Sequence, residues 1–225
     1  SHGKLSGQVT NKFSFNILGG YAAGVDGFEL GGLFNIDKKD VRYAQVGGLF
    51  NIVSGDVTGV QIAGITNKIN KSVSGVQVSG IASIVNGDIN GITVAGIGCR
   101  GGRSMKGIQI AGIANILDHA DTMASAADTI YSKKGMQLAG IANVVNGNSF
   151  GFQLAGIANV CRSNMKGLQM SGICNITKKL EGSQIGLINI ADTVTGDSIG
   201  LINIVKHGYH ALGISTNELT TINIA

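Results

Sequence analysis

A ten-residue unit recurs along almost the whole chain and constrains the fold more than any other feature. The unit reads Gly, apolar, Gln, apolar, Ala or Ser, Gly, Ile, small, Asn, apolar, and residues 107–116 are one copy. Copies start at positions 27, 43, 59, 75, 91, 107, 135, 151 and 167, so a 16-residue step recurs throughout. The exception is the longer step from 107 to 135, and a shorter step separates Gly186 from Gly200. A strict period of this length indicates a stack of similar coils.

The pattern inside each period predicts strands joined by turns. Apolar residues fall at positions 2, 4 and 7 of the unit and usually at position 15, and steps of two are typical of a strand. The steps of three coincide with glycines, which indicate bends, and spacers such as Asn86-Gly87-Asp88 have the residues of turns. The composition agrees, because 36 glycines, no proline and only 13% charged residues favour narrow coils over an ordinary globular domain.

Two architectures fit a period of this kind, and the recurring amides discriminate between them. Each period is either one coil of a parallel β-solenoid or one strand of an antiparallel outer-membrane barrel. Stacked parallel coils place like residues about 4.8 Å apart, where amides hydrogen-bond to one another, whereas a membrane barrel predicts aromatic girdles, and the chain has no Trp. We therefore predict an all-β fold, a single-stranded parallel β-solenoid (β-helix) with 16-residue coils and one short helical insertion. The predicted ladders are Asn35, Asn51, Asn67, Asn115, Asn143, Asn159, Asn175, Asn189 and Asn203, and Gln45, Gln61, Gln77, Gln109, Gln137, Gln153 and Gln169, with Thr93 as the exception.

The alternation also leads to a prediction for the direction of each side chain. Positions 2, 4 and 7 of the unit are expected to point inward and form an aliphatic core, and Gln at position 3 to point outward on a flat face. Asn at position 9 shares the parity of position 7. We expect it to lie at a corner, where its amide satisfies turn backbone groups that would otherwise be buried and unpaired.

The repeat boundaries predict three segments. Residues 1–26, which are richer in aromatics, are expected to form an N-terminal cap, and residues 27–204 the solenoid. Residues 205–225 lose the pattern and are predicted to be a C-terminal cap or the start of a missing domain. The additional residues of the longer step form an insertion, residues 117–134, in which residues 121–128 predict a short helix with Asp121 as its N-cap. Insertions of a solenoid often carry its binding face.

The repeats resemble the surface repeat-containing proteins of bacteria of the Bacteroidetes and Leptospira type. The resemblance is carried by the Gly-x-Gln-x-Ala-Gly-Ile-Ala-Asn units and by the tail segments 183–192, 199–206 and 215–218. It covers nearly the whole chain. It implies export and a location at the cell surface or outer membrane, or secretion, and it brings no catalytic motif. It also implies a chain that continues past the repeats.

Few residues suggest chemistry. No nucleophile, metalloprotease or phosphate-binding motif occurs, so we predict no catalytic residue, no cofactor and no enzyme activity. Asp118, His119 and Asp121 are weak candidates for metal ligands, because a metal site needs three or four converging ligands. The formal net charge of +4 is too small to predict a nucleic-acid partner.

Basic residues concentrate in the spacers and predict a basic edge along the rod, which could bind an anionic glycan or simply keep the rods apart. We therefore predict a non-catalytic structural, adhesion or binding scaffold whose partner is a protein or glycan at the cell surface, with membrane association through a missing segment as a further option. The alternatives are an outer-membrane barrel or pore component and a glycan-acting enzyme on a β-helix. The predicted edge comprises Lys68, Lys71, Arg100, Arg103, Lys106, Lys133, Lys134, Arg162, Lys166, Lys178 and Lys179.

Overall fold

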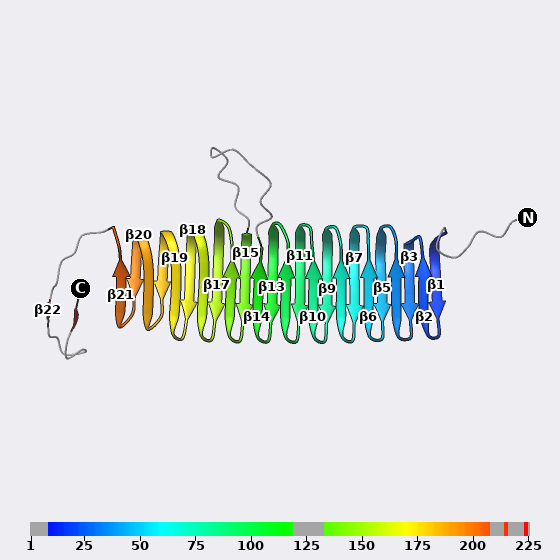
Figure 1. Cartoon of the computed structure of the whole chain (residues 1–225), viewed down its shortest axis with the longest axis horizontal. Coiled ribbons are helices and arrows are strands. Elements are labelled where there is room, and N and C mark those ends of the chain that lie inside the picture. The colour runs from blue at the N-terminus through cyan, green and yellow to red at the C-terminus, as the bar shows by residue number, and fades with distance from the viewer. Residues whose placement is uncertain (1–8, 119–132, 208–213, 216–222, 225) are drawn as a thin grey trace, which may run out of the picture.

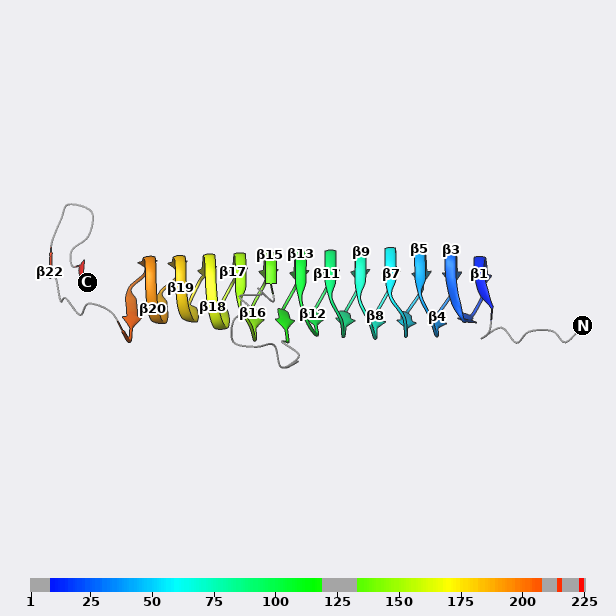
Figure 2. The same cartoon turned by 90° about the horizontal axis from the view of Figure 1, so that it is seen from above.

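The chain forms a straight rod of stacked two-stranded coils (Figures 1 and 2). The computed structural model describes residues 9–118, 133–207, 214–215 and 223–224. Each coil has one long and one short strand, and the long strands form one face of the rod while the short strands form the other (Figure 2). The long strands are β1 (Thr10–Asn16), β3 (Gly24–Gly31), β5 (Val41–Gly47), β7 (Val57–Ala63), β9 (Val73–Ser79), β11 (Ile89–Ala95), β13 (Met105–Ala111), β15 (Lys133–Ala139) and β17 (Ser149–Ala155). The short strands are β2 (Gly19–Ala22), β4 (Phe34–Asp37), β6 (Phe50–Val53), β8 (Thr66–Ile69), β10 (Ala82–Val85), β12 (Gly98–Gly101), β14 (Ala114–Leu117), β16 (Ala142–Val145) and β21 (Ile202–Val205).

Toward the C-terminal end, the strands of neighbouring coils merge. Strands β18 (Ala158–Ser171), β19 (Cys174–Ile185) and β20 (Ile188–Ile199) each run through the turn that separates a short strand from the next long strand in earlier coils. The sequence period shortens in this part of the stack, as it does between the paired residues Asn175 and Asn189. A separate antiparallel pair consists of β22 (Ile214–Ser215) and β23 (Asn223–Ile224).

The strands of successive coils pair in parallel with identical residues opposite one another, so the predicted solenoid is confirmed. Gln61 lies opposite Gln45 in the preceding coil and opposite Gln77 in the next. The register continues across the insertion, because β13 pairs directly with β15 and Gln109 lies opposite Gln137. The insertion therefore leaves the stack after Asp118 and returns at Lys133 without disturbing it.

The predicted inward and outward sets are wrong for four of the five positions. Gln at position 3 is fully buried, whereas the residues at positions 2, 4 and 7 of the coil that starts at Gly59 point outward with about 40% of their surface exposed: Val60 41%, Ile62 41% and Ile65 39%. Asn at position 9 is buried, as expected. The alternation of a strand requires adjacent residues to face opposite sides, but it does not determine which of the two sides is the interior. Hydrogen bonding decides the choice, because the amide ladder gains most in an interior without water.

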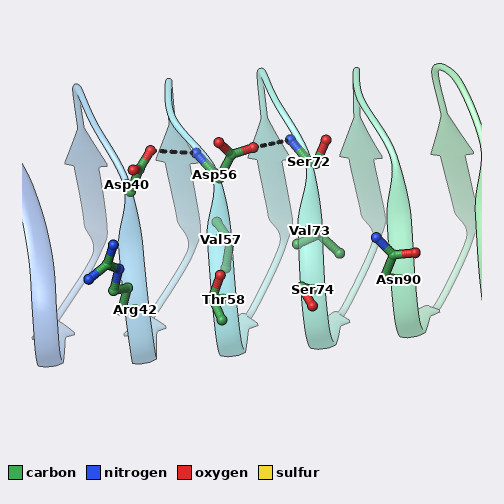
Figure 3. A pocket seen from close by; sticks show the side chains of 9 residues that line it. All are labelled: Asp40, Arg42, Asp56, Val57, Thr58, Ser72, Val73, Ser74 and Asn90. Atoms are coloured by element: carbon green, nitrogen blue, oxygen red, sulfur yellow. Dashed lines mark hydrogen bonds between the residues drawn. The ribbon is translucent and has the colours of Figure 1, made fainter.

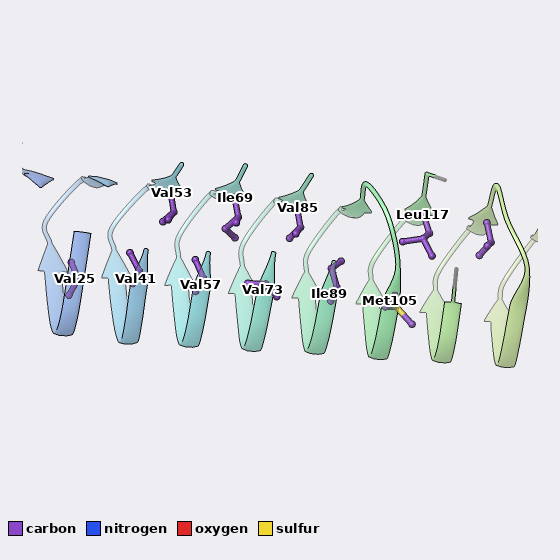
Figure 4. Close-up of a cluster of buried hydrophobic side chains, with 11 residues drawn as sticks. Val25, Val41, Val53, Val57, Ile69, Val73, Val85, Ile89, Met105 and Leu117 are labelled. Atoms are coloured by element: carbon purple, nitrogen blue, oxygen red, sulfur yellow. The ribbon is translucent and has the colours of Figure 1, made fainter. Parts of the chain in front are cut away.

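The interior is consequently divided into an aliphatic half and an amide half. The aliphatic half lies between the start of each long strand and the end of each short strand, where residues such as Val57 and Ile69 face one another (Figure 4). The amide half lies at the other margin and contains the Gln and Asn ladders together with small residues such as Ala63. The two turns of each coil therefore close over interiors of opposite chemical character.

The remaining segment predictions have different outcomes. Residues 10–22 of the predicted N-terminal cap contain β1 and β2, and β1 pairs in parallel with β3, so they form a coil of the stack. The predicted helix at 121–128 is not borne out: all regular elements among the described residues are strands, and those positions lie outside them. The described part of the C-terminal segment begins with the last residue of β21.

Candidate functional site

The two amide ladders hold neighbouring coils together and satisfy the corner backbone. In the Gln ladder, Nε2 donates to Oε1 of the preceding coil, as Gln61 does to Gln45 at 2.8 Å. In the Asn ladder, Asn51 Nδ2 donates to Asn67 Oδ1 at 2.9 Å and to the carbonyl oxygen of Ile62 at 2.8 Å. The predicted role of Asn at a corner is thus confirmed. The ladders fill the amide half of the interior with polar side chains that bond to one another.

Thr93 interrupts the Gln ladder and leaves three buried polar atoms without a partner among the described residues: Gln77 Oε1, Thr93 Oγ1 and Gln109 Nε2. Thr93 lies opposite Gln77 and Gln109 in the register. We expect Thr93→Gln to complete the ladder and raise the free energy of unfolding by about 1–2 kcal/mol, because it satisfies both amides with two new hydrogen bonds. Chemical denaturation measures the change. Thr93→Val, which removes the hydroxyl but adds no amide, should give no such gain, and an equal gain in both variants would contradict this account.

The Gln ladder ends on two buried acids in the N-terminal coils. Gln45 Nε2 donates to Glu29 Oε2 at 2.7 Å and to Asp37 Oδ2, and both acids are almost completely buried. Burial, together with the negative charge of Glu29, raises the pKa of Asp37 to about 8. Asp37 is therefore protonated at neutral pH.

The raised pKa of Asp37 predicts that stability falls as the pH rises from about 3.8 to about 8. The folded chain keeps the proton that the unfolded chain releases near pH 3.8, so the contribution is full below that pH and is lost as pH rises through about 8. We expect the free energy of unfolding to fall between pH 5 and 9 by an amount on the order of a few kcal/mol. Chemical denaturation at a series of pH values measures this fall. Asp37→Asn should remove most of this slope. An unchanged slope in that variant would show that Asp37 is not its source.

Lys133 does not belong to the basic edge, so that prediction is wrong for this residue. Its side chain is fully buried in the aliphatic half, at the register position of Met105 and Ser149 in the adjacent coils. Lys133 Nζ donates to the carbonyl oxygen of Phe152 at 2.9 Å. Burial lowers its pKa to about 7. The sequence held the signal, since Lys133 stands at position 15 of its period.

The other predicted basic residues form part of a mixed charged edge. We use this name for the turns that follow the short strands, together with the outward residue that directly precedes position 1 of each unit. Lys106, which precedes Gly107, is one such residue. Lys166 and Lys179 lie close to Glu181 there, so the edge is not purely basic. Its charged residues are Asp26, Lys38, Lys39, Asp40, Arg42, Asp56, Lys71, Asp88, Arg103, Lys106, Asp118, Lys134, Arg162, Lys166, Lys178, Lys179, Glu181, Asp192 and Lys206. The remaining predicted members, Lys68 and Arg100, point outward from short strands.

A shallow groove of about 350 Å³ follows the charged edge over β5, β7, β9 and β11 (Figure 3). Two carboxylates that line the groove are hydrogen-bonded to the backbone of the next coil. Asp40 Oδ1 accepts from the backbone N–H of Asp56, and Asp56 Oδ1 accepts from that of Ser72, both at 2.9 Å. Asp118, one of the weak metal candidates, accepts from Arg100 Nε at 2.7 Å and from Asn146 Nδ2 at 3.0 Å. His119 and Asp121 lie outside the described residues. The groove is therefore mainly a product of coil stacking.

The opposite margin of the rod carries an unbroken row of Ile and Leu, which we name the apolar ridge. It occupies position 7 of each unit, in the turn between a long strand and the next short strand, along the lower margin of the rod in Figure 1. Every member is exposed, from 38% for Leu49 to 81% for Leu201. Sequence reasoning missed this surface, because it assigned position 7 to the core. The ridge residues are Leu18, Leu33, Leu49, Ile65, Ile81, Ile97, Ile113, Ile141, Ile157, Ile173, Leu187 and Leu201.

The backbone N–H groups of the ridge turns are hydrogen-bonded along the stack. The N–H groups of Ile65 and Thr66 both donate to the carbonyl oxygen of Leu49, at 2.7 and 3.0 Å, and that of Gly64 donates to Gly47 at 3.3 Å. Similar bonds join most neighbouring ridge residues. The charged edge differs, because its backbone N–H groups also use Asp, Ser and Asn side chains.

Comparisons with known proteins found no match among family models, curated proteins or solved structures. Within the described residues, no helix is long and apolar enough to cross a membrane. The same part of the chain contains no group of three or more His, Cys, Asp or Glu residues that could hold a metal ion. The candidate functional surface is thus defined by the structure alone, and it is the apolar ridge.

Proposed function

We propose that this protein is a non-catalytic structural scaffold of the bacterial cell surface that uses its apolar ridge as a contact surface. The observation that carries the proposal is the unbroken row of exposed Ile and Leu. Soluble monomers rarely expose a continuous apolar patch of more than a few hundred Å². A ridge of twelve residues at about 4.8 Å per coil is about 53 Å long.

The rigid stack supports a scaffold role. Parallel backbone pairing and two amide ladders fix each coil against its neighbours, so the ridge is a straight and regular row. The resemblance of the repeats to bacterial surface proteins supports the location. An adhesive or binding role follows from the same surface, since a ridge left in water would favour association with any apolar partner.

Fractionation of the bacterial host tests this proposal. We expect the wild-type chain in the envelope fraction, accessible to protease added to intact cells. The triple variant Ile81→Gln, Ile97→Gln, Ile113→Gln should move to the soluble or secreted fraction, because it interrupts the ridge in its middle. The matched control Ile81→Leu, Ile97→Leu, Ile113→Leu keeps the ridge apolar and should behave as wild type. A triple Gln variant that folds and stays in the envelope would refute the role of the ridge.

A further inference from the structure

We propose that the apolar ridge binds lipid, with the rod lying along a membrane and the ridge inserted into the hydrocarbon of one leaflet. This inference rests on the proposed function, because it names the surface that the ridge contacts. Four features of the rod support it: the depth of the apolar band, the placement of charge, the bonded N–H groups of the ridge turns and the shape of the apolar surface.

The apolar band on the long-strand face has the depth of one leaflet. Up to the coil of Leu168 its outward residues near the ridge are apolar, as Val60 and Ile62 are, and the next outward side chain beyond the glycine is the polar Thr58. In the last two coils Ser183 and Asp197 take the register position of Val60, so the band ends before them. From Val60 to the turn at Gly64 the strand rises about 13 Å, at about 3.3 Å per residue. The hydrocarbon of one leaflet is about 15 Å deep, half of a bilayer core of about 30 Å. The band thus fits a single leaflet and is too shallow to span a bilayer.

The short-strand face is also apolar, and one of its two charged side chains, Arg100, supports the same orientation. Outward residues there include Ile84, Ile116 and Val144. The exceptions are Lys68 and Arg100. Arg100 points to the charged edge, away from the ridge, because its Nε donates to Asp118 at 2.7 Å. Long basic side chains of this kind place their charge at the headgroups while their stems remain in apolar surroundings.

The interior beneath the ridge suits a region without water. A turn in hydrocarbon is costly unless all its polar backbone groups are paired inside the protein. Here the N–H groups of Gly64, Ile65 and Thr66 are all bonded to the preceding coil, and the carbonyl oxygen of Ile62 accepts from Asn51. The carbonyl oxygen of Gly64 is the exception in this turn, since no group among the described residues donates to it. The amide ladders also keep their own polar atoms inward. In this half of the rod the polar side chains therefore bond to one another inside, and the apolar side chains face outward, where the proposed lipid lies.

The shape of the surface favours lipid over a second copy of the chain. Apolar side chains cover the convex ridge and both faces beside it, so two rods that met face to face would leave the ridge and one face of each rod in water. A fluid hydrocarbon phase covers all three surfaces at once. The end of β14 and the start of β15, between which the insertion stands in the sequence, lie on the margin opposite the ridge (Figure 1).

Flotation of the purified full chain with phosphatidylcholine vesicles tests the inference. We expect the wild-type chain to float with the vesicles and to float equally with vesicles that contain phosphatidylglycerol, because apolar insertion needs no headgroup charge. The triple Gln variant should bind at least about 100-fold more weakly, since each substitution removes a large apolar side chain from the contact. The triple Leu variant is the control, and circular dichroism checks that all three chains keep their strands.

Several outcomes of flotation would overturn the lipid assignment. One is the absence of wild-type chain from the floating fraction. Another is flotation with phosphatidylglycerol vesicles alone and its loss in high salt, which would assign binding to the charged edge. If the chain instead self-associates and the triple Gln variant is monomeric, the ridge joins copies of the chain. In that case the proposed function survives and the lipid inference fails, whereas envelope retention of the triple Gln variant in cells would remove both.

Single tryptophans provide a second test that does not disturb the ridge as strongly. The chain has no Trp, so Ile97→Trp on the ridge and Asn90→Trp on the charged edge each report one environment. With vesicles, we expect a blue shift and quenching by brominated lipid chains for Ile97→Trp and neither change for Asn90→Trp. Equal responses at the two positions, or a blue shift of Ile97→Trp without vesicles, would contradict insertion of the ridge.

Discussion

Replacing Gly107 by Ala should lower the free energy of unfolding by at least about 3 kcal/mol, through strain at a backbone angle that L residues avoid together with a direct clash. Gly107 has φ = +132°, and a Cβ atom there would lie 2.0 Å from the carbonyl oxygen of Gly91 in the preceding coil. That oxygen belongs to backbone and has no room to move without separating two coils. Chemical denaturation measures the loss, and hydrogen exchange should locate it in the coils around Gly107.

Gly98→Ala is the matched control. At Gly98 an added Cβ would meet only the carbonyl oxygen of Ala114, at 3.4 Å, and other coils carry Ala at the same register position, as Ala114 does. We expect this variant to be neutral or slightly more stable, since Ala restricts the unfolded chain more than Gly. Similar losses at the two glycines would mean that the position-1 glycines do not set the spacing of the coils.

Replacing Asn143 by Ala should cost about 3–5 kcal/mol. Asn143 Nδ2 donates to the carbonyl oxygen of Leu154 at 2.8 Å and to Asn159 Oδ1 at 2.9 Å, and its Oδ1 accepts from Asn115 Nδ2 at 2.9 Å. The Ala variant leaves two buried oxygens without a donor, and each unsatisfied buried group costs about 1–3 kcal/mol. Denaturation monitored by circular dichroism measures the change.

Asn203→Ala provides the comparison for Asn143→Ala. Asn203 occupies the same ladder position in the last coil, but it is exposed, and its own amide donates only a weak bond of 3.3 Å to Gly200. Water can replace its contacts, so we expect a loss below about 1 kcal/mol. A loss at Asn143 no greater than at Asn203 would show that the ladder contributes little beyond backbone pairing.

The amino-acid sequence determined the architecture. The 16-residue period and the recurrence of Gln and Asn at fixed positions predicted parallel stacking with like residues opposite one another, and the register of Gln61 and Gln77 has this form. The corner role of Asn also followed from the sequence, because an amide beside a glycine turn has few other partners. These features are local or periodic, so they can be read from the order of the residues alone.

Only the tertiary structure decided which side of each strand is the inside. Gln61 and Ile62 are adjacent, so a strand pattern alone allows either one to be buried. The closed coil decided in favour of Gln61, because buried amides hydrogen-bond from coil to coil wherever Gln recurs, whereas aliphatic side chains gain no such bonds. The same choice placed Ile65 and its counterparts outside as the apolar ridge. It also placed Lys133 inside, where the basic residues of the spacers had suggested an edge position.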